Sequence, residues 1–253
     1  MILVFGKTGQ LAVEFQRLGN SIALGREDAN LSDPQACGEA IRARMPTAVI
    51  NAAAYTAVDR AEEEEALATV INGDAPVAMA HVCSELGIPL IHISTDYVFD
   101  GTGESPWHPH DITVPTNAYG RSKLLGEVGI RASGAVYVIL RTSWVVSAQG
   151  INFVKTMLCL SETCDSVNVV ADQIGGPTPA SDIAVACMQI ANQLIQDPSK
   201  SGTYHFSGAP DLSWAQFATE IFDQANKTVT VKPIPTYDYP TLAKRPLNSR
   251  MDC

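Results

Sequence analysis

Basic side chains are scarce in this sequence, and acidic side chains outnumber them. The 253 residues contain 17 Lys and Arg against 27 Asp and Glu, which gives a formal net charge of −10 at pH 7. A chain of this charge repels the phosphate backbone, so we expect no nucleic-acid partner. An anionic small molecule would need a local group of cations, and the late residues Lys232, Lys244, Arg245 and Arg250 could form one.

Long hydrophobic runs and paired cysteines are also missing. No apolar stretch approaches the roughly 20 residues of a membrane span, and the start, "MILVFG", has no basic region typical of a signal peptide. We therefore expect no membrane partner. The six cysteines form no Cys-x-x-Cys pair and no zinc-binding spacing, which favours reduced thiols in a cytoplasmic protein.

Short apolar segments alternate with helical patterns through the first 140 residues. The apolar segments cover 2–5, 21–24, 48–51, 89–93 and 136–140, and a long helix is expected over 61–86. This alternation predicts an α/β protein with a Rossmann-like, doubly wound parallel sheet, whose ligand binds at the carboxyl ends of the strands.

The pattern is less regular after about residue 145, which indicates a smaller C-terminal substrate lobe interleaved with the sheet. Helices are expected in "INFVKTML", "ASDIAVACMQIANQLI" and, behind a Ser213 cap, "SWAQFATEIFDQA". We assign 1–150 to the dinucleotide-binding domain and add 167–197 to it. The substrate lobe then takes 151–166 and 198–253.

A glycine turn follows the first strand in "VFGKTGQLA". Gly6 permits the tight turn, Gly9 allows a phosphate to approach the backbone, and Ala12 at the third position still permits close packing of helix on strand. The helix N-terminus would offer free amides to a pyrophosphate. The turn therefore predicts a dinucleotide, although tight strand–helix turns use glycine for other reasons too.

The second strand ends without the acid that usually binds a free ribose 2′-hydroxyl. It ends in Leu24, Gly25 and Arg26, and an arginine there suits a 2′-phosphate. NADPH is therefore the favoured cofactor, with NADH as the alternative. Arg26 could equally be a solvated surface charge, and Asp28 lies close by.

Hydrogen-bonding side chains cluster where the fourth strand ends, in "STDYVFDG". A Tyr-x-x-x-Lys pair, Tyr119 and Lys123, follows on one face of a helix. An ammonium beside a phenol would lower the pKa of the tyrosine and make it a usable proton donor. Such pairs also arise by chance, but Ser94 or Thr95 could complete the site by polarising a carbonyl. His92, in the strand itself, is expected to be structural.

Glycine turn, strand-end hydroxyl and Tyr-x-x-x-Lys together resemble the extended short-chain dehydrogenase/reductases. The strings "NAAAYTAVDRAE", "STDYVFDG", "YGRSKLLGE", "LRTSWV", "VVADQIGGPT" and "RPLNSR" narrow the resemblance to the dTDP-4-dehydrorhamnose reductase family, from Ile2 to Asp252. That family implies a dTDP-sugar substrate and NADPH-dependent reduction of the C4 keto group of dTDP-4-dehydro-β-L-rhamnose, for cell-surface polysaccharide biosynthesis.

The resemblance also implies roles for individual residues. Tyr119 matches the proton donor, Lys123 its partner, and Thr95 the hydroxyl that tunes the carbonyl; Ser94 is left a structural role. Substrate contacts fall on Asp96, Tyr97, Trp144, Asp172, Gln173 and Arg245. Cofactor contacts fall on Gly6, Gly9, Gln10, Leu11, Arg26, Asn30, Leu31, Ala52, Ala53, Ala54, Tyr55, Thr56, Tyr119 and Lys123.

Some relatives differ from this chain in ways that matter. The family usually continues for a further helical segment after "NSRMD", so the substrate lobe is expected to be truncated here. Relatives can bind magnesium at a dimer contact that includes the position of Glu14 and a late acid. The late acid is missing, so we predict no metal, and a homodimer is left open.

Two other functions remain open. The same fold and cofactor could serve another nucleotide-sugar reductase or an epimerase, and epimerases keep NAD tightly bound. A relative of the family is the non-catalytic regulatory subunit of methionine adenosyltransferase. The presence of Thr95, Tyr119, Lys123 and Trp144 together favours the enzyme.

Overall fold

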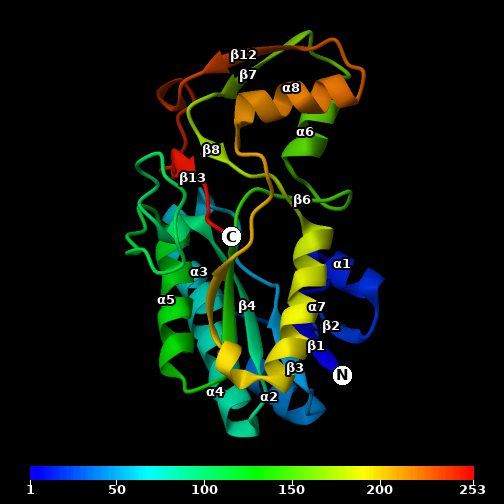
Figure 1. Ribbon diagram of the computed structural model, residues 1–253, viewed down its shortest axis with the longest axis vertical. Coiled ribbons are helices and arrows are strands. Elements are labelled where there is room, and N and C mark those ends of the chain that lie inside the picture. The colour runs from blue at the N-terminus through cyan, green and yellow to red at the C-terminus, as the bar shows by residue number, and fades with distance from the viewer.

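Six parallel strands form the central sheet of the computed structural model, which describes residues 1–253 (Figure 1). Their order is β10-β5-β4-β3-β1-β2. The strands are β1 (Ile2–Phe5), β2 (Ser21–Leu24), β3 (Ala48–Asn51), β4 (Leu90–Thr95), β5 (Tyr137–Thr142) and β10 (Gly202–His205). The chain passes from β1 to β2 on one side and returns to β3 on the other, so the order reverses between β1 and β3. In doubly wound sheets this switch point is where ligands bind. The predicted fold class is confirmed.

Helices cover both faces of the sheet, so strands β1, β3 and β4 are buried on both sides. One face packs against α2 (Pro34–Arg44), α4 (Ala75–Leu86) and α5 (Ala118–Ala132) in an 18-residue core. The other packs against α1 (Gln10–Leu18) and α7 (Ala180–Gln196) in a 15-residue core.

A smaller lobe stands beyond the carboxyl ends of these strands (Figure 1). It contains α6 (Phe153–Leu160), α8 (Trp214–Gln224) and a parallel pair formed by β7 (Ser166–Val170) and β12 (Thr230–Ile234) around its own core. Ser213 caps α8, as its sequence predicts, and Gln216 completes a capping box with it.

Short strands connect the lobe to the sheet. β8 (Ile174–Gly175) pairs with β11 (Leu212–Ser213) and with β13 (Asn248–Ser249). β6 (Val145–Val146) pairs with β9 (Thr178–Pro179). These pairs bring the segment after β5 and the C-terminal segment to the same edge of the sheet.

The predicted domain boundaries differ from the strand pairing at two points. We added 167–197 to the first domain, but β7 pairs with β12 in the lobe. We gave 198–253 to the lobe, but β10 pairs with β5 at the edge of the central sheet. Neither β7 nor β10 could be assigned from the local sequence, because each pairs with a strand far away in the chain. Only α7, within these ranges, packs against the sheet as expected.

The predicted long helix over 61–86 is interrupted. A 3₁₀ turn (Arg60–Glu62), α3 (Glu65–Thr69) and a π-helical turn (Val70–Asp74) precede α4. The π-helical turn packs against α5, where Asn72 donates to Ser122 at 3.0 Å. No helix is both long and apolar enough to cross a membrane.

Candidate active site

One large cavity lies at the switch point of the sheet, with a volume of about 1230 Å³. It extends from the glycine turn after β1 to Thr95, Tyr119 and Lys123, and on to Trp144 and Trp214 at the lobe. Every residue predicted to contact the cofactor lines it. The tertiary structure thus brings together residues from the ends of five strands of the central sheet and from the three helices α1, α5 and α8.

The glycine turn leaves the N-terminus of α1 open to a ligand. Gly6 has φ = 116°, a conformation that side-chain-bearing residues rarely adopt, and a Cβ there would contact Ala12 and the Ala52 backbone. Gly9 is the N-cap, and no side chain caps the first turn of α1. A Cβ on Gly9 would meet open space, so the cavity reaches the backbone here. These uncapped amides fit the pyrophosphate of a dinucleotide.

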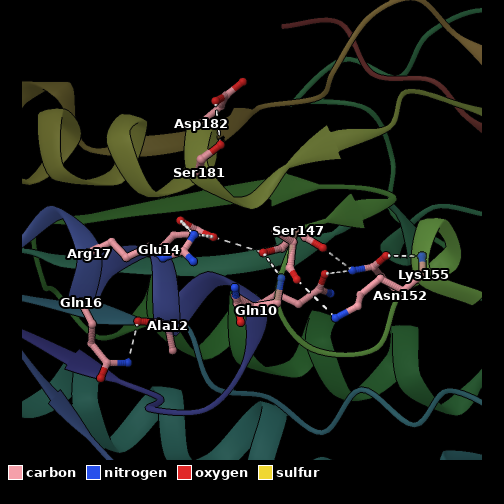
Figure 2. A network of polar contacts seen from close by, with 12 residues as sticks. Gln10, Ala12, Glu14, Gln16, Arg17, Ser147, Asn152, Lys155, Ser181 and Asp182 are labelled. Atoms are coloured by element: carbon pink, nitrogen blue, oxygen red, sulfur yellow. Dashed lines mark hydrogen bonds and ion pairs between the residues drawn. The ribbon is translucent and has the colours of Figure 1, made fainter. Parts of the chain in front are cut away.

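Gln10 is held in place by the segment between β6 and α6 (Figure 2). Asn152 donates to Gln10 Oε1 at 2.8 Å and to the Ser147 carbonyl at 2.7 Å. Glu14, buried on the next turn of α1, accepts from the Ser147 hydroxyl at 3.1 Å and from Arg17 at 3.1 Å (Figure 2). The first turn of α1 is therefore braced against the substrate lobe.

A carboxylate lies at the β2 end of the cavity although no acid stands at the end of β2. The side chain of Glu27 folds back over Gly25, and a Cβ on Gly25 would lie 2.6 Å from its carboxyl carbon. Lys7 of the glycine turn donates to Glu27 at 2.8 Å. Arg26 is exposed, lines the cavity and forms no ion pair. This end of the cavity therefore presents Arg26, Lys7 from the glycine turn, and the Glu27 carboxylate above Gly25.

Tyr119 and Lys123 lie on α5, and Thr95 lies at the end of β4. The sequence predicted that Lys123 lowers the pKa of Tyr119, but this is wrong. Burial raises the pKa of the Tyr119 phenol, the Asp96 carboxylate raises it further, and the Thr95 hydroxyl partly offsets them. The Lys123 amine is instead bonded to the Ile93 carbonyl at 2.6 Å, so its charge is not directed at the phenol.

Thr95 and Asp96 form a buried pair at the centre of the cavity. The Thr95 hydroxyl donates to Asp96 Oδ1 at 2.9 Å, and Ser249 of the C-terminal segment donates to Oδ2 at 2.6 Å. Burial raises the pKa of Asp96 to about 6, and the two hydroxyl bonds oppose that rise. Tyr97 packs edge-on against Tyr119, with ring centroids 5.4 Å apart. Ser94 instead donates to Glu127 at 2.6 Å, in agreement with its expected structural role.

Lys123 is 2 % exposed, and its amine contacts the buried imidazole of His92. Its amine lies 3.1 Å from His92 Nε2, and His92 Nδ1 lies 3.1 Å from the Asn51 amide nitrogen. Burial lowers the pKa of Lys123 to about 8, while Glu127 raises it. Burial and then the charge of Lys123 lower the pKa of His92 far below its usual value. His92 was expected to be only structural.

Trp144 forms the wall of the cavity toward the lobe. Its backbone has φ = 48°, the left-handed region that costs a non-glycine residue of order 1–3 kcal/mol. The indole stacks on that of Trp214 with centroids 3.5 Å apart. A Cβ on Gly175 would come within 2.8 Å of the ring, so a glycine is needed beneath it.

Three predicted substrate residues lie apart from this centre or at its edge. Gln173 lines the cavity and donates to Thr236 at 3.2 Å. Asp172 is exposed, does not line the cavity, and accepts from Thr236 Oγ1 at 2.6 Å. Arg245 also lies outside the lining; it pairs with Asp59 and donates to the Tyr97 hydroxyl at 3.4 Å. Their substrate roles stay predictions.

Sequence reasoning missed four residues that the cavity brings in or supports. Glu27 stands three residues after the end of β2 and is the first acid that follows this strand, a signal that the sequence itself carries. Trp214 had been assigned only to a helix, and Ser249 only to a family string. Lys7 lies inside the glycine turn itself. Nothing local in the sequence distinguishes Trp214 or Ser249, because β11 and β13 must first pair with β8.

Comparison with known proteins supports the resemblance seen in the motifs. The family model described as the RmlD substrate binding domain matches residues 1–253. A dTDP-4-dehydrorhamnose reductase of Sinorhizobium fredii is 42% identical over 262 aligned positions, covering 100% of this chain and 88% of that protein. The Salmonella typhimurium enzyme of the same name is 39% identical, covering 99% and 89%.

Solved structures agree in fold. The dTDP-4-dehydrorhamnose reductase of Clostridium acetobutylicum superposes with a TM-score of 0.93 at 38% identity, over 99% of this chain and 89% of that one. The Bacillus anthracis reductase, solved in complex with NADP, gives 0.93 at 35% identity with the same coverage. A Thermus thermophilus UDP-glucose 4-epimerase, at 19% identity and 0.77, shares the fold. This chain therefore belongs to the family of dTDP-4-dehydrorhamnose reductases, NAD(P)H-dependent oxidoreductases of Rossmann-like fold.

Proposed function

We propose that this chain catalyses the NADPH-dependent reduction of dTDP-4-dehydro-β-L-rhamnose at C4 to give dTDP-L-rhamnose. The observation that carries the proposal is one continuous cavity with an uncapped helix N-terminus at one end and Thr95, Tyr119 and Lys123 at the other. The relatives' names and the NADP complex of the Bacillus anthracis protein support the same substrate and cofactor.

The nicotinamide cofactor would supply the hydride when bound, and the chain's own residues manage the proton. Because its pKa is raised, the Tyr119 phenol stays protonated throughout the neutral range and can give its proton to an alkoxide, which is far more basic. In this scheme Thr95 steadies the carbonyl oxygen with the hydroxyl proton that Asp96 Oδ1 otherwise accepts. Lys123 returns a proton to the tyrosinate.

The aromatic wall and the acidic pair would position the sugar. Trp144 and Trp214 offer a flat apolar surface at the lobe, and Asp96 can accept from a sugar hydroxyl in exchange for Ser249. At the other end Arg26 and Lys7 fit a 2′-phosphate, whereas Glu27 fits a free ribose hydroxyl. This mixture supports NADPH with NADH as an alternative.

The test of the reaction is a mixture of the protein, NADPH and dTDP-4-dehydro-β-L-rhamnose, in which we expect nicotinamide absorbance to fall and dTDP-L-rhamnose to form. Tyr119→Phe should lower kcat by about 10²–10⁴-fold because the proton donor is lost, while the protein still binds NADPH. Tyr204→Phe is the matched control, since its hydroxyl bonds only the Lys200 carbonyl on the surface.

Two results would contradict the proposal. Full activity of Tyr119→Phe would refute the proton-donor role, and wild-type protein that binds NADPH but leaves this ketosugar unreduced would refute the substrate. Tightly bound NAD in the purified protein would favour the epimerase alternative. The cytoplasmic location and the homodimer stay predictions.

A further inference from the structure

Three buried polar side chains, those of Asn51, His92 and Lys123, are in contact in a row that runs from the end of β3 to α5. Asn51 ends β3, His92 lies beside it on β4 as its register partner, and Lys123 comes from α5. They are 1 %, 0 % and 2 % exposed. Adjacent register partners project to the same face of a sheet, so Asn51 and His92 both point toward the helix layer that carries Lys123.

The direction of each hydrogen bond in this row of side chains follows from the orientation of the Asn51 amide. The backbone N–H of Ala53 donates to Asn51 Oδ1 at 3.2 Å, so the oxygen of that amide faces Ala53 and its NH₂ group faces His92 Nδ1 at 3.1 Å. An amide nitrogen can only donate, so Nδ1 must accept. A neutral imidazole with an acceptor at Nδ1 carries its proton on Nε2.

The Nε2–H of His92 therefore points at the Lys123 amine, 3.1 Å away. An ammonium has no lone pair to accept this bond, but a neutral amine does. A neutral amine can also keep its bond to the Ile93 carbonyl at 2.6 Å. Both contacts are satisfied when Lys123 is unprotonated, and the burial of its side chain favours the same state.

We propose that Asn51 and His92 are positioning residues that favour the neutral amine of Lys123 over its ammonium. In each turnover the amine takes up the one proton that the reduction consumes, from hydronium in the solvent, which is left as water. The His92 N–H then opposes the ammonium, which turns from His92 toward Tyr119 one helical turn away. The ammonium then passes its proton to the tyrosinate left by each turnover and returns, neutral, to His92. The catalytic part of this cycle rests on the proposed function; the hydrogen-bond assignment does not.

Other ionisable groups around Lys123 do not supply this control. Glu127, on the same helix, raises the pKa of Lys123 and is itself bonded to Arg141 of β5 at 2.7 Å and to Arg131. Asp74, on the π-helical turn packed against α5, has an exposed side chain. Tyr119 is neutral in the neutral range because its pKa is raised. The only polar contacts of the amine are His92 and Ile93.

The first experiment reads the tautomer in the wild-type, cofactor-free chain. Long-range ¹H–¹⁵N NMR separates protonated from unprotonated ring nitrogens, and the loss of one of the five histidine signals in His92→Gln assigns His92. We expect a protonated Nε2 and an unprotonated Nδ1 near neutral pH. A protonated Nδ1 would overturn the proposal. This measurement needs no substrate, so it stands or falls apart from the proposed reaction.

The second experiment reverses the tautomer with the isosteric Asn51→Asp. A carboxylate accepts from both Ala53 N–H and His92 Nδ1–H, which leaves Nε2 free to accept from an ammonium. The pKa of Lys123 should then rise. Because activity needs the ammonium, it falls as pH rises through that pKa, and the alkaline limb of kcat/KM should move from near pH 8 upward by about one unit or more.

The control variant for Asn51→Asp adds a negative charge far from Lys123. Asn20→Asp, on the exposed turn after α1, should leave the limb in place. If Asn51→Asp lowers kcat but leaves both the limb and the His92 tautomer unchanged, Asn51 is merely structural and the proposal fails. If Asn51→Asp does not fold, the wild-type tautomer alone decides.

Discussion

At the residue scale, Glu27 shows how a missing side chain can be replaced by a neighbour. Gly25 stands at the strand end where an acid would bind a free ribose, and the Glu27 carboxylate lies over its Cα. The Lys7 ammonium donates to that carboxylate at 2.8 Å. The Lys7 hydrogen bond and charge lower the pKa of Glu27, so the carboxylate is ionised at neutral pH.

We predict that Glu27→Gln shifts the cofactor preference toward NADPH. The change removes repulsion from a 2′-phosphate, frees Lys7 to bind it, and weakens the contact with a free ribose hydroxyl. The ratio of kcat/KM for NADPH over NADH should rise about tenfold, and Arg26→Gln should lower it by a similar factor. Glu39→Gln, an exposed acid of α2, is the control that should leave the ratio unchanged. An unaltered ratio in Glu27→Gln would show that Glu27 does not contact the ribose.

At the scale of elements, α5 is the helix that sets the catalytic geometry. Three of its positions are glycines, at 120, 126 and 129, and two of them lie against backbone. A Cβ on Gly120 would collide with the Tyr97 carbonyl oxygen, and one on Gly126 with the Asn72 carbonyl oxygen of the π-helical turn. The close approach of α5 to these segments fixes where Tyr119 and Lys123 stand relative to Thr95.

We predict that Gly126→Ala destabilises the fold although alanine is the better helix former. The helix preference favours alanine by roughly 0.5–1 kcal/mol, but backbone on the facing turn cannot move aside as a side chain can. We expect a net loss of about 1–3 kcal/mol in the free energy of unfolding in urea, with reduced kcat because α5 shifts. In the control Gly38→Ala, the new Cβ would lie 3.1 Å from a Val82 methyl group, which can give way. Equal stability of both variants would contradict this account of α5.

At the scale of the whole molecule, the cavity lies where the substrate lobe meets the carboxyl edge of the central sheet. The β4–α5 side contributes Thr95, Tyr119 and Lys123, and the lobe contributes Trp214. Trp144, in its left-handed conformation after β5, stacks on Trp214 and joins the two sides. The C-terminal segment adds Ser249, which bonds Asp96.

We predict that Trp214→Ala weakens sugar-nucleotide binding and spares the cofactor. Loss of the stacked ring removes apolar surface and leaves Trp144 free to move, so KM for the sugar nucleotide should rise about tenfold or more. NADPH affinity should stay within about twofold, measured by fluorescence titration, because the glycine turn is untouched. Phe217→Ala, on the same helix but outside the cavity lining, separates loss of the wall from loosening of the lobe. A rise in KM common to both variants would assign the effect to the lobe core.

Much of this could be predicted from the sequence because the signals are local. Apolar runs predicted five of the six strands of the central sheet, all except β10, because a strand buried on both faces is mostly apolar along its length. Gly6 and Gly9 predicted the phosphate turn through the backbone conformations that only glycine permits easily. Helical spacing put Tyr119 and Lys123 on one face, and the strand end put Thr95 at the sheet edge where they meet.

Ionisation states and long-range partners could not be read in the same way. The sequence placed an ammonium four residues from a phenol and so suggested a lowered tyrosine pKa. Burial reverses that direction, and the Lys123 amine turns to His92 and Ile93 instead. Likewise β10 joins the central sheet and β7 leaves it, because each depends on a partner strand far away in the chain. The sequence by itself determined the strands, the phosphate turn and the residue types of the active site, since these depend on local conformation and spacing. Only the tertiary structure decided which groups are desolvated, which hydrogen bonds they form and therefore which proton each one carries.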